Sequence, residues 1–170
     1  DLGLHAEVNT MPWDCQIVDD TPDRVSLRCW VRTYRTPFTF EKTLSLTSGS
    51  PVLEVEQALL NEGEEPVHCV WGEHIALGAP FLSEDCVIDL PGGRIINHPV
   101  DWDPGNRLKA GFEGPWPWSD GRDGVRIDLS KVPPRSARAL DQSYITDMPE
   151  GWYAITNQKM RLGFGVVFPT

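Results

Sequence analysis

Polar and apolar residues alternate along most of this chain, first clearly at Arg24–Val31. Every second side chain from Val25 to Val31 is apolar, which is typical of a strand that buries one face. The same pattern recurs in Phe38–Phe40, Thr43–Leu46 and Val52–Leu60, and the turn-forming residues between the last two predict a hairpin. Further strands are expected at Val67–Trp71, Cys86–Leu90, Arg94–His98, Val125–Leu129, Gln142–Thr146, Trp152–Thr156 and Met160–Phe168.

Helical periodicity is poor throughout, and Gly/Pro turns are frequent. Many short strands without a long helical window predict an all-β sandwich or barrel. We expect a single domain over residues 1–170. The segment Asn97–Asp123 departs from the pattern, because it is long, rich in proline and carries several aromatic residues. Long loops in compact domains are usually functional or disordered, and the aromatic content argues against disorder.

The chain has 170 residues and a formal net charge of −10. This charge argues against nucleic acid or an anionic membrane as the partner, since both require a basic surface. It leaves a neutral, polyhydroxylated or cationic ligand open. The sequence has no apolar run of transmembrane length. Because the chain starts at Asp1 within a motif-like stretch, we expect that residues preceding it are missing.

The cysteines are Cys15, Cys29, Cys69 and Cys86, and none forms a C-x-x-C pair. Cys29 and Cys69 lie in apolar patterns and are predicted to be buried thiols. An even count permits disulfides without requiring them. A reducing cytoplasm is the default location.

A histidine-based metal site is one alternative. His68 and His74 have the same strand parity but would lie roughly 20 Å apart on a straight strand, too far to share one ion. His98 could approach either of them in the fold. No H-E-x-x-H motif and no G-x-S-x-G elbow is present, so we expect no metal, no other cofactor and no serine nucleophile of that kind.

Three short segments resemble the galactose-mutarotase-like (aldose 1-epimerase) superfamily. Asn61–His74 resembles the turn "N-x-G-x-x-P" followed by a strand that ends in glycine and histidine, here Gly72 and His74. Gly3–Glu7 resembles an "L-H-G" segment, with alanine in place of the glycine. Leu140–Tyr144 resembles a later "L-D-x-x-F/Y" segment. The three segments follow one another in the family order.

The resemblance implies an antiparallel β-sandwich of the mutarotase (supersandwich) type that lacks terminal strands, and a monosaccharide or sugar derivative as ligand. It implies that His74 is the catalytic acid, a role in which histidine is common. It also implies that His5 and Asp141 bind the sugar, and that the family's basic glutamate would lie beyond Thr170. The expected activity is interconversion of sugar anomers, without a cofactor.

Aromatic faces pack on the C–H faces of sugars. We therefore expect Trp71, Trp116 and Trp118 to contact the ligand, although Trp71 is equally suited to a core and the other two to stabilising the loop. A non-catalytic sugar-binding β-sandwich module predicts the same pocket without a base, and it stays the main alternative. A homodimer is also expected, since exposed strand edges invite pairing.

Overall fold

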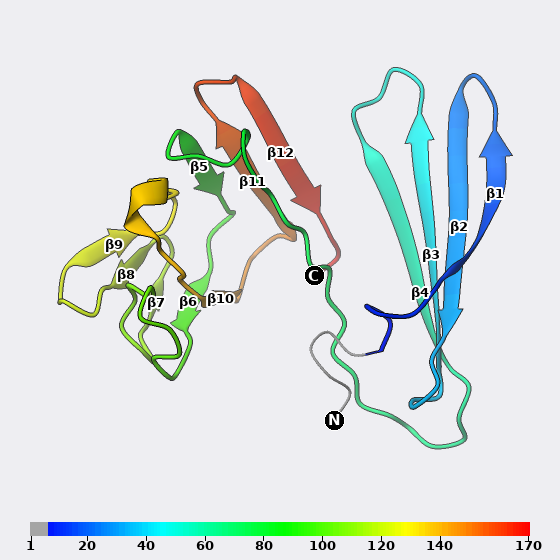
Figure 1. The fold of residues 1–170 in the computed structure, drawn as a ribbon, viewed down its shortest axis with the longest axis horizontal. Helices are drawn as coiled ribbons and strands as arrows, with labels where there is room; N and C mark the ends of the chain where they lie inside the picture. The colour runs from blue at the N-terminus through cyan, green and yellow to red at the C-terminus, as the bar shows by residue number, and fades with distance from the viewer. Residues whose placement is uncertain (1–6) are drawn as a thin grey trace. The chain divides into compact units, whose positions relative to one another are not determined.

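The structure is a computed structural model that describes residues 7–170, and it is nearly all β (Figure 1). Every strand pair in this part of the chain is antiparallel. Among the same residues the helical content is one 3₁₀ turn, η1 (Arg135–Ala137). The expected fold class, an all-β antiparallel sandwich-like architecture, is confirmed. The chain divides into two compact units, Asp1–Gly72 and Glu73–Thr170. The single domain over 1–170 stays a prediction.

The first unit is a four-stranded meander in the order β1-β2-β3-β4 (Figure 1). Its strands are β1 (Asp14–Asp20), β2 (Arg24–Arg32), β3 (Phe38–Thr47) and β4 (Leu53–Asn61). The predicted β3–β4 hairpin is confirmed. Strand β1 was not predicted, because its register shifts between Ile17 and Asp19 and this irregularity interrupts the alternation.

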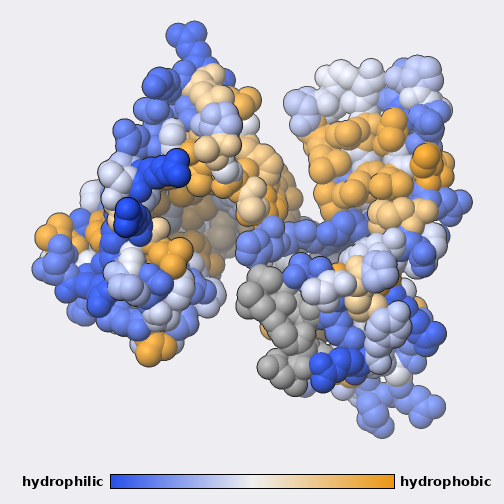
Figure 2. Space-filling model, in the orientation of Figure 1, coloured by the Kyte–Doolittle hydropathy of each residue, from blue (hydrophilic) through white to orange (hydrophobic). Residues whose placement is uncertain are grey.

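The register gives this sheet one polar and one apolar face. Ser26 lies opposite Ser45 on the polar face, where their buried hydroxyls are 2.7 Å apart. Leu27, Leu44 and Val55 are aligned on the apolar face. Figure 2 shows hydrophobic residues gathered over part of this sheet.

The second unit contains three small sheets. The sheet β10-β6-β7 and the sheet β12-β11-β5 each have three strands, and β8 pairs with β9. Six of the predicted strands are confirmed within one or two residues at each end. The bounds are β5 (Cys86–Asp89), β6 (Arg94–Asn97), β7 (Glu113–Pro115), β8 (Trp118–Asp120), β9 (Arg126–Asp128), β10 (Ser143–Thr146), β11 (Trp152–Asn157) and β12 (Leu162–Val167).

The strand predicted at Val67–Trp71 is wrong. These residues lie in no strand and are exposed, and Val70 is fully so. An alternating pattern makes a strand only when a neighbouring strand satisfies its backbone groups, and none in the described residues pairs with this segment. The prediction that Cys29 and Cys69 are buried thiols is also wrong. Cys69 is exposed, and Cys29, on β2, is only half-buried.

The side chain of Glu7 stabilises the loop between β2 and β3 through hydrogen bonds. Its carboxylate accepts hydrogen bonds from the backbone N–H groups of Tyr34 and Arg35, at 3.1 and 2.8 Å, and from the hydroxyl of Thr36. Burial raises the pKa of Glu7, but these hydrogen bonds to the charged form outweigh it and lower the pKa below its ordinary value of 4.5. The loop is therefore held by an ionised carboxylate.

A pH titration tests this contact. A group with a lowered pKa in the fold stabilises above its unfolded pKa, and that contribution is lost as pH falls through the folded pKa. The amide proton shifts of Tyr34 and Arg35 should therefore titrate with a midpoint below 4.5 in NMR spectra. Glu7→Gln should abolish the titration, while Glu64→Gln in an exposed turn should not. A midpoint at or above 4.5 would contradict the assignment.

Candidate functional site

The second unit contains a hollow of about 370 Å³ that is lined mainly by apolar side chains. Its walls come from β5, β10 and β11 and from the segments around residues 107, 116 and 130. Four polar or charged side chains, Arg107, Lys131, Asp141 and Ser143, interrupt the apolar lining. The remaining lining residues are Ile88, Leu90, Leu108, Trp116, Leu129, Val132, Pro133, Ile145 and Tyr153.

Asp141 is bound by Arg107. The Nε of Arg107 lies 2.9 Å from Oδ2 of Asp141, and its Nη2 lies 2.5 Å from the same oxygen. The backbone N–H of Arg107 donates to Oδ1 at 2.9 Å. The Asp141 side chain is 17% exposed and that of Arg107 is 33% exposed. The pair therefore fixes a carboxylate at the edge of the hollow in one orientation.

A close backbone approach brings these two residues together, although they are 34 positions apart. The N–H of Leu140 donates to the carbonyl of Gly105 at 3.0 Å. A Cβ at Gly105 would lie 2.9 Å from the carbonyl oxygen of Arg138, so a larger residue would force the two segments apart. The N–H of Gly105 is in turn fixed by the carboxylate of Asp103.

The other polar groups of the hollow differ in how they are engaged. The hydroxyl of Ser143 donates to the side-chain oxygen of Asn97 at 2.7 Å. Within residues 7–170, no hydrogen bond or ion pair engages the ammonium of Lys131 or the hydroxyl of Tyr153. Burial raises the pKa of Tyr153 above its ordinary value of 10, so its phenol is neutral at pH 7.

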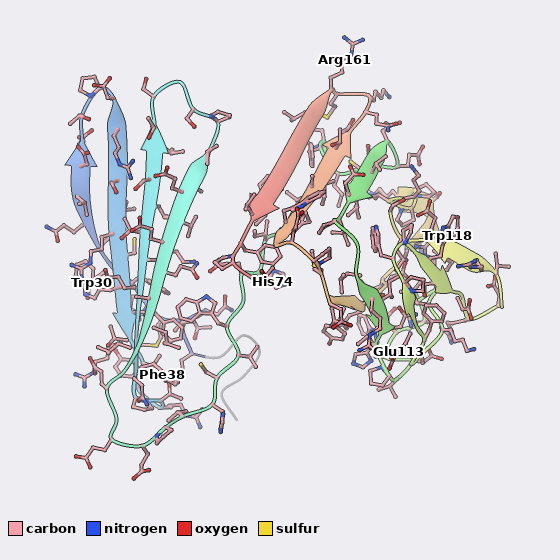
Figure 3. The ribbon with its side chains drawn as sticks, turned by 180° about the vertical axis from the view of Figure 1, so that it is seen from behind. Trp30, Phe38, His74, Glu113, Trp118 and Arg161 are labelled. Atoms are coloured by element: carbon pink, nitrogen blue, oxygen red, sulfur yellow. The ribbon has the colours of Figure 1, made fainter. Side chains whose placement is uncertain are left out.

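Two of the residues predicted from the sequence line this hollow, Asp141 and Trp116. Trp118 is 42% exposed on β8 and packs against the guanidinium of Arg126, 5.4 Å from its ring centroid (Figure 3). It is not among the lining residues.

The other predicted residues lie elsewhere. Trp71 belongs to the first unit, where its ring packs on Phe40 at 5.2 Å and its indole N–H donates to Gln57 at 2.6 Å. At 39% exposed, Trp71 is not a buried core residue, and it does not line the hollow. His74 is exposed on a strand-free segment (Figure 3) and does not line the hollow. His5 lies outside the described residues.

Arg107, Lys131, Ser143 and Tyr153 were missed by the sequence reasoning. Arg107, Lys131 and Tyr153 stand in no recognisable motif. Ser143 lies within the Leu140–Tyr144 segment, but at a position that the motif leaves unspecified. The remaining signal was that Ser143 and Tyr153 fall near the start of predicted strands.

No group of three or more His, Cys, Asp or Glu side chains in the described part of the chain could hold a metal ion. The histidine-based metal site therefore has no supporting cluster there. In the same residues, no helix is long and apolar enough to cross a membrane.

The fold and the hollow define the class: an all-β protein whose second unit carries an open, mostly apolar hollow with a fixed carboxylate. No family model, curated protein or solved structure matches the chain.

The Arg107–Asp141 pair should stabilise the second unit measurably. We expect Asp141→Asn to lower the free energy of unfolding by about 1–3 kcal/mol, because it removes charge-assisted hydrogen bonds from a half-buried guanidinium. Glu113→Gln is the matched control. It breaks the exposed pair with Arg94, 3.0 Å long, and should cost only about 0–1 kcal/mol.

Urea unfolding followed through the NMR signals of β6 and β10 measures both effects. A double-mutant cycle with Arg107→Gln isolates the coupling between the two side chains. Equal costs for Asp141→Asn and Glu113→Gln would show that the pair contributes no more than a surface contact.

Proposed function

We propose that the Glu73–Thr170 unit binds a sugar, an aldose or a derivative of one, in the hollow beside Trp116 and Asp141. The observation that carries the proposal is the Asp141 carboxylate, which Arg107 holds in place at the edge of a mostly apolar hollow that Trp116 also lines. The resemblance of Leu140–Tyr144 to a sugar-binding segment independently points to the same aspartate.

The polar groups of the hollow suit a ligand with several hydroxyls. Each hydroxyl is both a donor and an acceptor, so a sugar needs alternating partners. The oxygens of Asp141 accept, the remaining N–H groups of Arg107 and the ammonium of Lys131 donate, and the neutral phenol of Tyr153 does either. A fixed carboxylate loses little further conformational freedom when a ligand binds.

The shape and the apolar lining support the same class of ligand. Small-molecule sites usually have volumes of about 300–1,000 Å³ and mostly apolar walls with a few polar groups. At about 370 Å³ the hollow is near the lower end of this range, which suits a single ring. Trp116 offers an aromatic surface for the apolar C–H face of a pyranose.

Binding without catalysis is the form of the proposal that the site favours. Mutarotation needs a base at the anomeric hydroxyl and an acid at the ring oxygen. The expected acid, His74, is not among the residues of the hollow, and the carboxylate of Asp141 is engaged by Arg107. The epimerase activity, its base beyond Thr170, the homodimer and the cytoplasmic location all stay predictions.

The two tryptophans provide a matched test of binding. We titrate the 170-residue chain with galactose, glucose and glucuronate and follow amide NMR shifts. Signals of residues 88–153 around the hollow should move. Trp116→Leu should weaken binding roughly tenfold or more, because it removes the aromatic surface, while Trp118→Leu should leave binding unchanged. Absence of shifts with every sugar, or loss of binding only in Trp118→Leu, would overturn the proposal.

Polarimetry separates binding from catalysis. If the hollow only binds, the intact protein should not accelerate the interconversion of galactose or glucose anomers beyond the rate in buffer. His74→Gln should then behave like the unaltered chain. An acceleration that His74→Gln removes would instead establish the epimerase activity.

A further inference from the structure

Two cysteines of the first unit lie directly opposite each other on neighbouring strands. Cys15 on β1 is the register partner of Cys29 on β2, and their Sγ atoms are 2.7 Å apart. Directly opposed residues of an antiparallel pair have Cβ atoms about 4.5–5.5 Å apart, and a disulfide needs about 3.5–4.5 Å. The 2.7 Å between the Sγ atoms is within about 1 Å of the S–S bond length of about 2.05 Å, so a small approach of the two strands brings the thiols into bonding geometry.

The surroundings of this pair make it chemically accessible. Cys15 is exposed and Cys29 is half-buried. Both side chains have the strand parity of the apolar face, and Lys42 is the register partner of Cys29 on the next strand, β3. The other two cysteines differ: Cys86 is buried and donates to the carbonyl of Phe81, and Cys69 is exposed outside any strand.

We propose that Cys15 and Cys29 form a reversible disulfide that joins the edge strand β1 to β2, made by exchange with a low-molecular-weight disulfide and broken by a thiol. The pair lies in the first unit and the proposed sugar site in the second, so the failure of one proposal does not affect the other.

The chemistry follows ordinary thiol–disulfide exchange. The thiolate of Cys15 attacks one sulfur of the small disulfide and releases one thiol. The thiolate of Cys29 then attacks the Cys15 sulfur of the mixed disulfide and releases the second thiol. The protein loses two electrons and two protons, and the small disulfide gains them. A low-molecular-weight thiol in excess reverses both steps.

The order of the two attacks is set by the environment of Cys29. The hydrogen bond with Cys15, burial and the charge of Cys15 raise the pKa of Cys29 to about 11, against the attraction of Lys42. Cys29 therefore keeps its proton while Cys15 is present as its partner. The exposed Cys15 is consequently the first nucleophile, since a thiolate that solvent can reach reacts first.

The position of the pair gives the bond a structural consequence. Strand β1 is at the edge of the four-stranded sheet and is exposed along most of its length. Its ladder to β2 is interrupted by the register shift after Ile17. A disulfide between residues 14 positions apart restricts the detached states of β1 and should suppress its local opening.

The test uses the 170-residue chain under native conditions. The protein is incubated with excess oxidised glutathione, remaining thiols are blocked with N-ethylmaleimide, and the unreduced digest is analysed by mass spectrometry. We expect one cross-linked product that joins the peptides of Cys15 and Cys29, and its loss after treatment with dithiothreitol. Cross-links to Cys69, or only separate glutathione adducts on Cys15 and Cys29, would overturn the proposal.

A second measurement addresses the consequence for β1. Oxidation should slow hydrogen exchange of the β1 amides by roughly tenfold or more, because the disulfide between Cys15 and Cys29 suppresses local opening of β1. Cys15→Ser and Cys29→Ser should each abolish this change, while Cys69→Ser, the matched control, should retain it. Equal slowing in Cys15→Ser would contradict the proposal, and the cross-link in the unaltered chain can be read even if a variant fails to fold.

Discussion

The side-chain amide of Asn97 is the contact on which the second unit depends most. It is 1% exposed at the end of β6. Its nitrogen donates to the carbonyl of Lys109 and to the hydroxyl of Ser119, and its oxygen accepts from Ser143. A buried amide left without partners would cost about 1–3 kcal/mol, so these three segments are held together by one side chain. The wall of the hollow formed by Ser143 is positioned by the same bonds.

Two further buried asparagines repeat this arrangement. Asn157, also 1% exposed, donates to the carbonyl of Phe81 and accepts from the N–H of Met160. Asn106 bonds both to the N–H and to the carbonyl of Leu108, next to Arg107. The sheets of this unit have only two or three strands, so their ladders leave many backbone groups without a strand partner. Amide side chains satisfy these groups, and they orient the residues that carry the candidate site.

The sequence located most strands because one-sided burial imposes a period of two, as in Arg24–Arg32. The failures have identifiable causes. The irregular register of β1 interrupts the alternation. Strands β7 and β8 are short and lie in the proline-rich Asn97–Asp123 segment, where no alternation is visible. Val67–Trp71 shows that alternation reports the suitability of a segment for a strand and not the presence of a partner. In the site, a short motif pointed to Asp141, but Arg107 lies 34 residues away with no local pattern.

Net charge is a poor guide to the ligand of such a protein. The chain carries a formal charge of −10, which by itself favours neutral or cationic partners. The charged side chains of the hollow are Arg107, Lys131 and Asp141, two cations and one anion. Because exposed charges beyond about 8–10 Å are largely screened at physiological ionic strength, the local set determines what binds. Arg107 and Asp141 largely neutralise each other, and Lys131 then leaves the hollow locally positive on a negatively charged protein. An acidic substituent on the proposed sugar ligand is therefore compatible with the site, even though the overall charge argues against an anionic ligand.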